Sequence, residues 1–258
     1  MKPLRLGVLG SGKGSNFVAL AEAIRSEQIP AKIVLVASDL AEAKILARAR
    51  ERKLLVYVCR RSGFQTKLEP EIEEELAGAL AKAGVELVVL AGYMRVLKKP
   101  LLEGLCGRII NIHPSLLPSF PGLKAWEQAL KARVTQTGCT VHWVNETVDG
   151  GEVIRQVKVN VQPGDTAESL HARIQEAEHR LLPTPPPNPL QSPAPASSEK
   201  YSAGRRRLAA SSPGPGQESS SRQDRSPPAQ PWPELLPPGW PPPKPQSCSP
   251  CRSRAPPA

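Results

Sequence analysis

An amide side chain and an imidazole lie two positions apart in this sequence, at Asn111 and His113. They follow the β-branched pair Ile109 and Ile110, which indicates a buried strand, and alternate residues of a strand share one face. An amide donor beside a group that titrates near neutral pH suits acyl transfer, in which a carbonyl oxygen gains charge while a proton moves. The pair alone would equally fit a turn-forming Asn and a capping or core His.

The segment after His113 contains three prolines within eight residues, Pro114, Pro118 and Pro121. Proline lacks an amide hydrogen and has a fixed φ, so a regular helix or strand is excluded here. The strand predicted at residues 108–112 therefore ends in an irregular loop. Open parallel α/β sheets bind their ligands at the carboxyl ends of the strands, so we expect the functional site at this point.

A second candidate site lies near the N-terminus, where the apolar run Leu4 to Leu9 leads into the glycine-rich segment Gly10 to Asn16. A strand, a glycine loop and a helix begin a nucleotide-type βαβ unit, whose free N–H groups and helix dipole favour a phosphate. Gly14 follows Lys13, which excludes a Walker A motif, and Ser15 stands where a dinucleotide fingerprint has glycine. The loop predicts a phosphate monoester as ligand. The alternative is a tight turn that binds nothing.

Apolar runs and amphipathic stretches alternate along the first part of the chain. This alternation predicts a doubly wound, Rossmann-like α/β fold with a mostly parallel sheet and right-handed crossovers. The expected strands are 4–9, 32–37, 54–59, 85–90, 108–112, 139–144 and 153–159. The expected helices are 16–25, 41–51, 68–83, 124–134 and 166–182, the last capped by Asp165 or Thr166.

Several polar residues receive a purely structural interpretation at this stage. Ser38 and Asp39 are expected to cap the helix at 41–51. A solvated face is expected for the acidic residues of helix 68–83, namely Glu71, Glu73, Glu74 and Glu75. The remaining histidines are expected to be structural or exposed: His142, His171 and His179.

The composition changes sharply after residue 182, because 22 of the 30 prolines lie in residues 183–258 together with Ser, Arg and Gln tracts. Such a segment cannot bury enough apolar surface to offset its ordering entropy. We therefore expect one domain at 1–182 and a disordered low-complexity, proline-rich C-terminal tail at 183–258.

Charge and cysteine usage narrow the class of protein. Residues 1–182 carry 25 basic and 20 acidic side chains, a mild excess that suits a small anionic substrate rather than a nucleic acid. Neither a signal peptide nor a membrane span is recognisable, so a cytoplasmic protein without a membrane partner is expected. Three cysteines are expected to be reduced core thiols: Cys59, Cys106 and Cys139. Cys248 and Cys251 form half of a zinc-ribbon pattern, and no metal is expected.

Five segments carry a family resemblance in their order and spacing: Gly10 to Asn16, Ala91 to Leu97, Asn111 to Pro118, Gly138 to His142 and Val148 to Gly151. With them, residues 1–182 resemble the phosphoribosylglycinamide formyltransferases, the folate-dependent glycinamide ribonucleotide transformylases of purine synthesis. The Asn-x-His pattern with a downstream Asp is shared by all formyltetrahydrofolate-using relatives. The glycine-serine-asparagine loop and the Pro-Ser-Leu-Leu-Pro sequence narrow the resemblance to these transformylases.

The resemblance implies a role for each matching residue. The implied catalytic set is Asn111, His113 and Asp149, with Asp149 keeping the His113 imidazole charged and oriented. The implied contacts to the substrate phosphate and ribose are Gly14, Ser15, Asn16, Gln175 and Glu178. The implied folate-binding residues are Met94, Arg95, Val96, Leu97, Asn111, Asn145, Glu146, Thr147, Val148 and Asp149.

The implied reaction transfers the formyl group of 10-formyltetrahydrofolate, a co-substrate, to the amino group of 5'-phosphoribosylglycinamide in de novo purine biosynthesis. Only small-molecule partners are then expected, with a monomer or homodimer as the active form. A formyltetrahydrofolate hydrolase would be expected to carry a regulatory domain before the catalytic one, and a methionyl-tRNA formyltransferase a basic domain after it. A non-catalytic interaction protein that uses its proline-rich tail is the third alternative.

Overall fold

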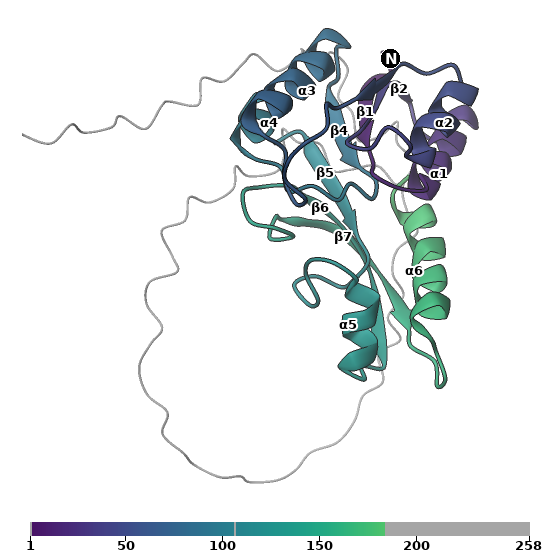
Figure 1. Cartoon of the computed structure of the whole chain (residues 1–258). Helices are drawn as coiled ribbons and strands as arrows, with labels where there is room; N and C mark the ends of the chain where they lie inside the picture. Colours follow the sequence, from purple (N-terminus) through teal and green to yellow (C-terminus); the bar gives the residue numbers. More distant parts are fainter. Residues whose placement is uncertain (1, 106, 184–258) are drawn as a thin grey trace, which may run out of the picture.

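The computed structural model describes residues 2–105 and 107–183, and these form one seven-stranded sheet in the order β3-β2-β1-β4-β5-β6-β7 (Figure 1). The strands are β1 (Leu4–Leu9), β2 (Ala31–Ser38), β3 (Val56–Val58), β4 (Leu87–Leu90), β5 (Ile109–His113), β6 (Gln136–Trp143) and β7 (Val153–Asn160). The helices are α1 (Ser15–Arg25), α2 (Lys44–Glu51), α3 (Pro70–Lys82), α4 (Lys99–Gly104), α5 (Ala125–Lys131) and α6 (Ala167–Leu181).

The sheet is mostly parallel, which confirms the predicted fold class. Strands β1 to β5 pair in parallel, whereas β6 runs antiparallel to β5 and β7 antiparallel to β6. From β1 the chain first builds outward to β2 and β3, then returns to place β4 on the other side of β1. The carboxyl ends of β1 and β4 therefore flank the switch point at which such sheets bind ligands.

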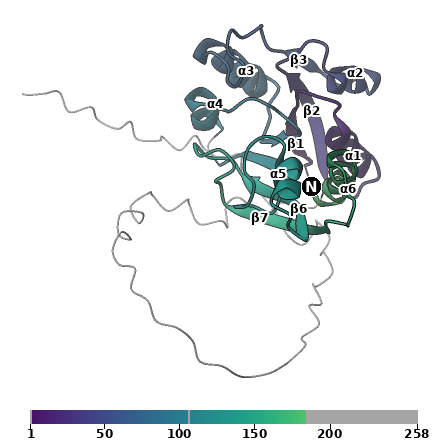
Figure 2. The same ribbon diagram turned by 60° about the horizontal axis from the view of Figure 1, so that its bottom comes forward.

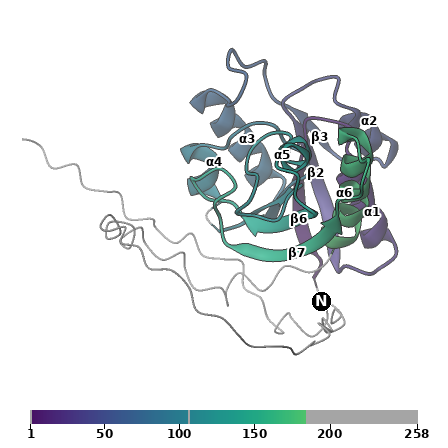
Figure 3. The same ribbon diagram turned by 90° about the horizontal axis from the view of Figure 1, so that it is seen from below.

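Helices cover both faces of the sheet, with α3 and α4 on one face and α1, α2 and α6 on the other (Figures 2 and 3). Alternate strand residues supply the two cores, as the period of a strand requires. Leu6 and Val8 of β1 pack with the α1, α2 and α6 side, whereas Leu9 packs with α3 and α4. Both faces of the central strands are thus buried, which explains why their sequences are apolar without alternation.

The side chains of strand β5 change from apolar to polar toward its carboxyl end, and the polar ones form part of the candidate site. Ile110 and Ile112 point into the core formed with α1 and α6, and Ile109 points into the core formed with α3 and α4. Asn111 and His113 continue the Ile109 face beyond the apolar layer. They pair with β6 in register, Asn111 opposite His142 and His113 opposite Thr140.

Two of the structural expectations are wrong: the cap formed by Ser38 and Asp39, and the solvated position of Glu73. Helix α2 begins at Lys44 after Ala43, so Ser38 and Asp39 do not cap it. The Asp39 carboxylate is buried, and it accepts a hydrogen bond from Ser11 Oγ at 2.5 Å and lies 2.6 Å from Arg95 Nε.

Glu73 is the other exception, because it is fully buried while the remaining three acidic residues of α3 are exposed. Its carboxylate accepts the backbone N–H of Lys98 at 2.9 Å and ties α3 to the segment before α4. Helix α4 itself, only six residues long, was not predicted.

The last helix begins as predicted. Thr166 accepts the backbone N–H of Ser169, whose side chain accepts the backbone N–H of Thr166, forming a capping box. Cys59 and Cys139 are buried free thiols, as predicted, whereas Cys106, Cys248 and Cys251 lie outside the described residues. In the part of the chain that the structure describes, no helix is long and apolar enough to cross a membrane.

Candidate active site

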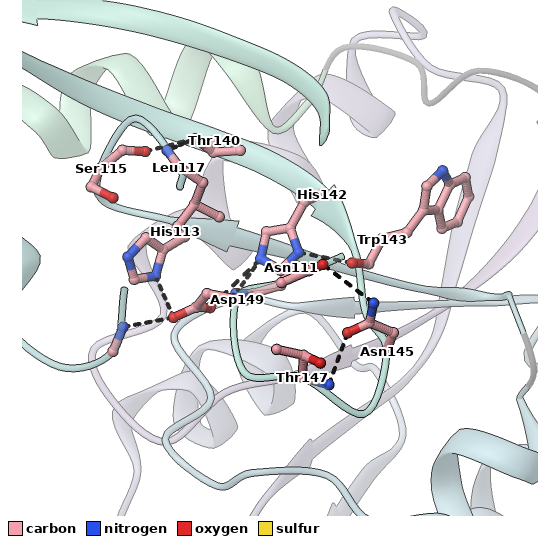
Figure 4. Close-up of polar contacts among 12 residues, drawn as sticks. Asn111, His113, Ser115, Leu117, Thr140, His142, Trp143, Asn145, Thr147 and Asp149 are labelled. Carbon is pink, nitrogen blue, oxygen red and sulfur yellow. Dashed lines mark hydrogen bonds and ion pairs between the residues drawn. The ribbon is translucent and has the colours of Figure 1, made fainter. Parts of the chain in front are cut away.

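His113 lies at the carboxyl end of β5 with one ring nitrogen beside the Asp149 carboxylate (Figure 4), and its other ring nitrogen also contacts an oxygen atom. Its Nδ1 is 3.3 Å from Asp149 Oδ2, and its Nε2 is 2.9 Å from the Phe120 carbonyl oxygen. The side chain is 6% exposed. An imidazole between two acceptors is oriented on both sides and is offered a partner for each hydrogen of its charged form.

Asp149 reaches His113 from the loop between β6 and β7, where its backbone adopts a left-handed φ of 51°. Gly122 donates its backbone N–H to Asp149 Oδ2 at 2.8 Å, and Asn111 Nδ2 donates to Oδ1 at 3.4 Å. Burial raises the pKa of Asp149, but proximity to His142, the hydrogen bond from the Gly122 N–H and proximity to His113 outweigh burial and lower the pKa overall. Asp149 is therefore a carboxylate at neutral pH.

Burial lowers the pKa of His113, against the opposing influence of the Asp149 carboxylate and the Phe120 carbonyl. Burial thus opposes the charged form of His113 that the resemblance implies, whereas the two oxygen atoms beside the ring are positioned for the form that carries an additional proton.

Thr140 holds the proline-containing loop against β6. Its hydroxyl donates to the Ser115 carbonyl at 2.6 Å and accepts from the Leu117 backbone N–H at 3.1 Å and from Gln156 Nε2 at 2.9 Å. Gln156 also donates to the Leu117 carbonyl at 2.8 Å. The loop that carries the Phe120 carbonyl to His113 is therefore fixed by strands β6 and β7.

His142 belongs to this constellation, although the sequence interpretation left it outside. Its side chain is 2% exposed, and its Nε2 lies 3.1 Å from Asn111 Nδ2 and 3.7 Å from Asp149 Oδ1. Asp149 therefore lies between the two imidazoles (Figure 4). The missed signal was the antiparallel register of β5 and β6, which places His142 opposite Asn111. His171, in contrast, stacks on Trp126 with ring centroids 3.7 Å apart, consistent with a structural role.

The glycine loop opens helix α1 with Gly14 as N-cap in a left-handed conformation, φ 72°. A Cβ at Gly14 would lie 2.8 Å from the Ile45 side chain and 2.9 Å from its Cα, so conformation and space both require glycine. No side chain caps the helix, and its first N–H groups stay available for an anion.

Glu178 of α6 meets the glycine loop at Asn16, whose Nδ2 donates to Glu178 Oε2 at 2.9 Å. Both side chains are buried, and burial raises the pKa of Glu178 to about 7. Asn16 Oδ1 is buried without a hydrogen-bond partner in the described residues. Gln175 lies one turn earlier on α6 and is half-buried. Two elements that are distant in sequence are thus joined by a buried polar contact.

The predicted folate-binding residues after β4 differ in their exposure. Met94 is 56% exposed, whereas Leu97 is buried in the core beneath α3 and α4. Val96 donates its backbone N–H to the Thr66 carbonyl at 2.8 Å. Arg95 bonds to Asp39 and to the Phe64 carbonyl, so its guanidinium fixes the neighbouring loops. Only Met94 of these four residues presents a largely free side chain.

The other predicted folate-binding segment is the turn before Asp149. Asn145 Oδ1 accepts the Thr147 backbone N–H at 2.9 Å, and Asn145 Nδ2 donates to the Gly150 carbonyl at 3.3 Å. Glu146 and Val148 are exposed. This turn is closed by its own side chain and presents its apolar Val148 to solvent.

The glycine loop and the imidazoles lie at one edge of the sheet. The Ser11 backbone N–H bonds to the Gly92 carbonyl at 3.0 Å, and Leu90 pairs in register with Asn111. The candidate phosphate site and the candidate reaction centre therefore flank the end of β4. Among the described residues, no group of three or more His, Cys, Asp and Glu could hold a metal ion.

A family model described as formyl transferase matches residues 4–185. The chain belongs to the formyl transferase family. Membership implies an enzyme that acts on small molecules with a folate co-substrate.

Individual relatives agree with this assignment. The chain is 40% identical over 179 residues to "Phosphoribosylglycinamide formyltransferase" of Haemophilus influenzae, a match that covers 69% of this chain and 84% of the relative. It is 46% identical over 181 residues to "Trifunctional purine biosynthetic protein adenosine-3" of Drosophila pseudoobscura pseudoobscura, covering 69% of this chain and 13% of that protein. The solved structure of glycinamide ribonucleotide transformylase 1 from Symbiobacterium toebii matches with a TM-score of 0.67 and 43% identity, over 70% of this chain and 85% of that one.

Proposed function

We propose that this protein transfers the formyl group of 10-formyltetrahydrofolate to the amino group of 5'-phosphoribosylglycinamide, a step of de novo purine biosynthesis. The observation that carries the proposal is that Asp149 contacts both Asn111 and His113. These contacts lie at the end of the sheet where the glycine loop also lies. An acyl-transfer centre beside a phosphate site fits a substrate that has a nucleophilic amine and a phosphate monoester. The named relatives support the same activity.

The reaction begins when the glycinamide amine attacks the formyl carbon, which forms a new C–N bond and a tetrahedral oxyanion. The oxyanion accepts a hydrogen bond from the Asn111 amide and gains stabilisation from His113, which takes up the proton that the attacking amine loses and holds it before it passes to N10. The bond from the formyl carbon to N10 of the folate then breaks. The proton lost by the attacking amine passes to N10, so that formylated glycinamide and tetrahydrofolate are the products.

Asp149 supports this sequence as a fixed negative charge. Its carboxylate lies 3.3 Å from His113 Nδ1 and is held by the Gly122 N–H, so it stabilises the imidazolium when the ring takes up a proton. Because burial disfavours the charged ring, this carboxylate matters most in the transition state, where His113 holds a proton.

In this proposal the substrate phosphate accepts hydrogen bonds from the backbone N–H groups of Gly14, Ser15 and Asn16. Glu178 and Gln175 of α6 then face the ribose. The buried, unpartnered Asn16 Oδ1 supports a polar ligand here, because such an atom costs free energy until it receives a hydrogen bond.

The folate lies along the ends of β4 and β6 in this proposal, between the segments Met94 to Leu97 and Asn145 to Asp149. Most of the first segment offers backbone groups and an apolar wall, because Arg95 is engaged with Asp39 and Leu97 is in the core. Exposed Met94 and Val148 provide apolar surface for a planar ring.

The wider context is part of the same proposal. Residues 1–182 form the catalytic domain, and residues 183–258, which lie outside the described residues apart from Pro183, take no part in catalysis. The enzyme acts in the cytoplasm as a monomer or homodimer, without nucleic acid, membrane or metal as a partner.

The test is an assay of the purified full-length chain with 10-formyltetrahydrofolate and 5'-phosphoribosylglycinamide, in which formylated product and tetrahydrofolate are measured by mass spectrometry. We expect both products in equal amounts and no folate turnover when the ribonucleotide is omitted. Equal folate turnover without the ribonucleotide would indicate a hydrolase instead. Inactive protein whose circular dichroism is that of a folded α/β domain would refute the proposal.

A further inference from the structure

His142 lies buried beside both Asn111 and Asp149 but has no part in the reaction described so far. It projects from β6 directly opposite Asn111 of β5. Its Nδ1 is 2.8 Å from the Trp143 carbonyl oxygen, and its Nε2 is 3.1 Å from Asn111 Nδ2 (Figure 4). The imidazole thus has one polar atom within hydrogen-bond distance on each side, while Asp149 Oδ1 lies farther from Nε2, at 3.7 Å.

These two partners allow a single arrangement of hydrogens on the ring. A carbonyl oxygen can only accept, so Nδ1 of His142 carries the hydrogen. An amide nitrogen can only donate, so Nε2 of His142 offers its lone pair to Asn111. In this arrangement His142 carries its ring hydrogen on Nδ1, and it acts as an acceptor toward Asn111.

This acceptor determines which way the Asn111 amide faces. Both hydrogens of Asn111 Nδ2 have partners, His142 Nε2 at 3.1 Å and Asp149 Oδ1 at 3.4 Å. If the amide turned over, its oxygen would face the Nε2 lone pair and the carboxylate, and three acceptors would meet without a hydrogen between them. That arrangement is repulsive, so the observed orientation is fixed by His142 and Asp149 together.

The two hydrogen bonds of the amide differ in how easily they are given up. The bond to Asp149 Oδ1 is the longer one, and Asp149 keeps the Gly122 N–H at 2.8 Å if that bond is lost. The bond to His142 is shorter, and His142 has no other donor to replace Asn111 at Nε2 among the contacts of the described residues. The hydrogen directed at Asp149 is therefore the one available to a ligand.

We propose that His142 is a positioning residue that holds one N–H of Asn111 so that the other, now directed at Asp149, turns to the formyl oxygen as it becomes negative. The inference rests on the proposed formyl transfer. Without the acceptor at position 142, the amide samples both orientations, and only one of them presents an N–H to the oxyanion. Transition-state stabilisation falls, while ground-state binding of the ribonucleotide is unaffected.

A matched pair of variants separates this role from simple packing. His142→Leu removes the acceptor and keeps an apolar side chain, whereas His142→Gln can place its amide oxygen where Nε2 stood. For His142→Leu we expect kcat to fall about 10-fold to 100-fold, less than on outright removal of an oxyanion donor, with KM for the ribonucleotide within about twofold. His142→Gln is expected to recover most of kcat. Equal loss in both folded variants, or a loss confined to KM, would overturn the proposal.

A spectroscopic measurement tests the hydrogen arrangement independently of activity. In the full chain with ¹⁵N-labelled histidine, the His142 resonances, assigned by their loss in His142→Gln, are expected to show a protonated Nδ1 and an unprotonated Nε2. An Nε2–H or doubly protonated ring would refute the orientation of Asn111 argued here. The spectrum is recorded without substrates, so its result stands whether or not formyl transfer to the ribonucleotide is observed.

Discussion

Asp149 is the carboxylate that faces the other three polar residues of the site. One of its oxygens faces His113, and the other faces Asn111 and His142. For Asp149→Asn we expect kcat to fall by about two orders of magnitude or more, in the range for loss of a preorganised electrostatic partner. Substrate affinity should change far less, because the phosphate is assigned to the glycine loop. The measurement is kcat together with separately determined binding of both substrates.

The pH profile adds a second readout for Asp149→Asn. The carboxylate raises the pKa of His113 against burial, so its removal lets burial lower that pKa further. The limb of the profile that reports His113 should move to lower pH in the variant. Asp165→Asn, which removes a carboxylate paired with Arg173 at 2.8 Å outside the site, is the matched control. An unmoved profile with normal turnover would leave Asp149 as a turn residue only.

Glu178 gives a prediction on stability, because burial raises its pKa to about 7 from the usual value of 4.5. The folded state then binds the proton more tightly than the unfolded state between these values, so stability from this group is present at low pH and lost as pH rises through 7. Relative to Glu178→Gln, the wild type should lose on the order of 2 kcal/mol between pH 5 and pH 8. Urea unfolding of both proteins measures this difference, and parallel pH dependences would contradict it.

The sequence predicted site residues where the signal was local and missed them where it depended on pairing. Asn111 and His113 follow from strand periodicity, and Gly14 from the loop between strand and helix. Asp149 came only from the resemblance, because nothing local connects it to a strand that ends far earlier in the chain. His142 required the β5–β6 register, and the direction of the His113 pKa shift required its burial.

At the scale of elements, hydrophobic periodicity predicted every strand and every helix except α4. Helix α4 has only six residues and is too short to show a period. The start of α2 was misplaced because Ser38 and Asp39 resemble a cap. The tertiary contacts of Asp39 with Ser11 and Arg95 override that local preference and join three loops at the edge of the sheet.

The proline-containing loop depends on one hydroxyl, that of Thr140. Thr140→Val keeps the shape but leaves the Leu117 N–H without its partner and deprives the Ser115 carbonyl of its donor. We expect a loss of about 1–3 kcal/mol in the free energy of unfolding and a lower kcat, because the loop also carries the Phe120 carbonyl. Thr140→Ser keeps the hydroxyl and should retain most of both. Urea unfolding and kcat measure the effects, and a Val variant equal to the Ser variant would contradict this account.

The glycine loop offers a matched pair of substitutions. Gly14→Ala places a Cβ 2.8 Å from Ile45 at a φ of 72°, whereas a Cβ at Gly12 meets nothing within 4 Å. We expect Gly14→Ala to raise KM for the ribonucleotide about 10-fold or more, because the N–H groups of the first turn shift. Gly12→Ala should change KM little. Steady-state kinetics at saturating folate measure KM for the ribonucleotide in both variants. An equal effect of the two substitutions would mean that the loop does not bind the phosphate.

At the scale of the whole molecule, all proposed site residues belong to the described domain. The glycine loop belongs to the parallel half of the sheet, and Asp149 follows the antiparallel strand β6. Helix α6 packs on α1 and brings Glu178 to Asn16, so the end of the domain completes a site that its first loop begins. The reaction centre therefore forms only when both halves of the sheet are assembled.

Residues 183–258 carry a net charge of +5, equal to that of residues 1–182, and a basic tail could in principle attract an anionic substrate. The preorganised N–H groups at the start of α1 should nevertheless provide the affinity, because they are oriented before the ligand binds and lose little entropy on binding. Removing residues 184–258 is thus expected to leave KM for the ribonucleotide within about twofold at 0.15 M salt, with Pro183 retained after the last turn of α6. The kinetics of the truncated and full-length chains measure this effect, once circular dichroism has shown that both are folded. A large rise of KM in the folded truncated chain would assign the phosphate affinity to the tail.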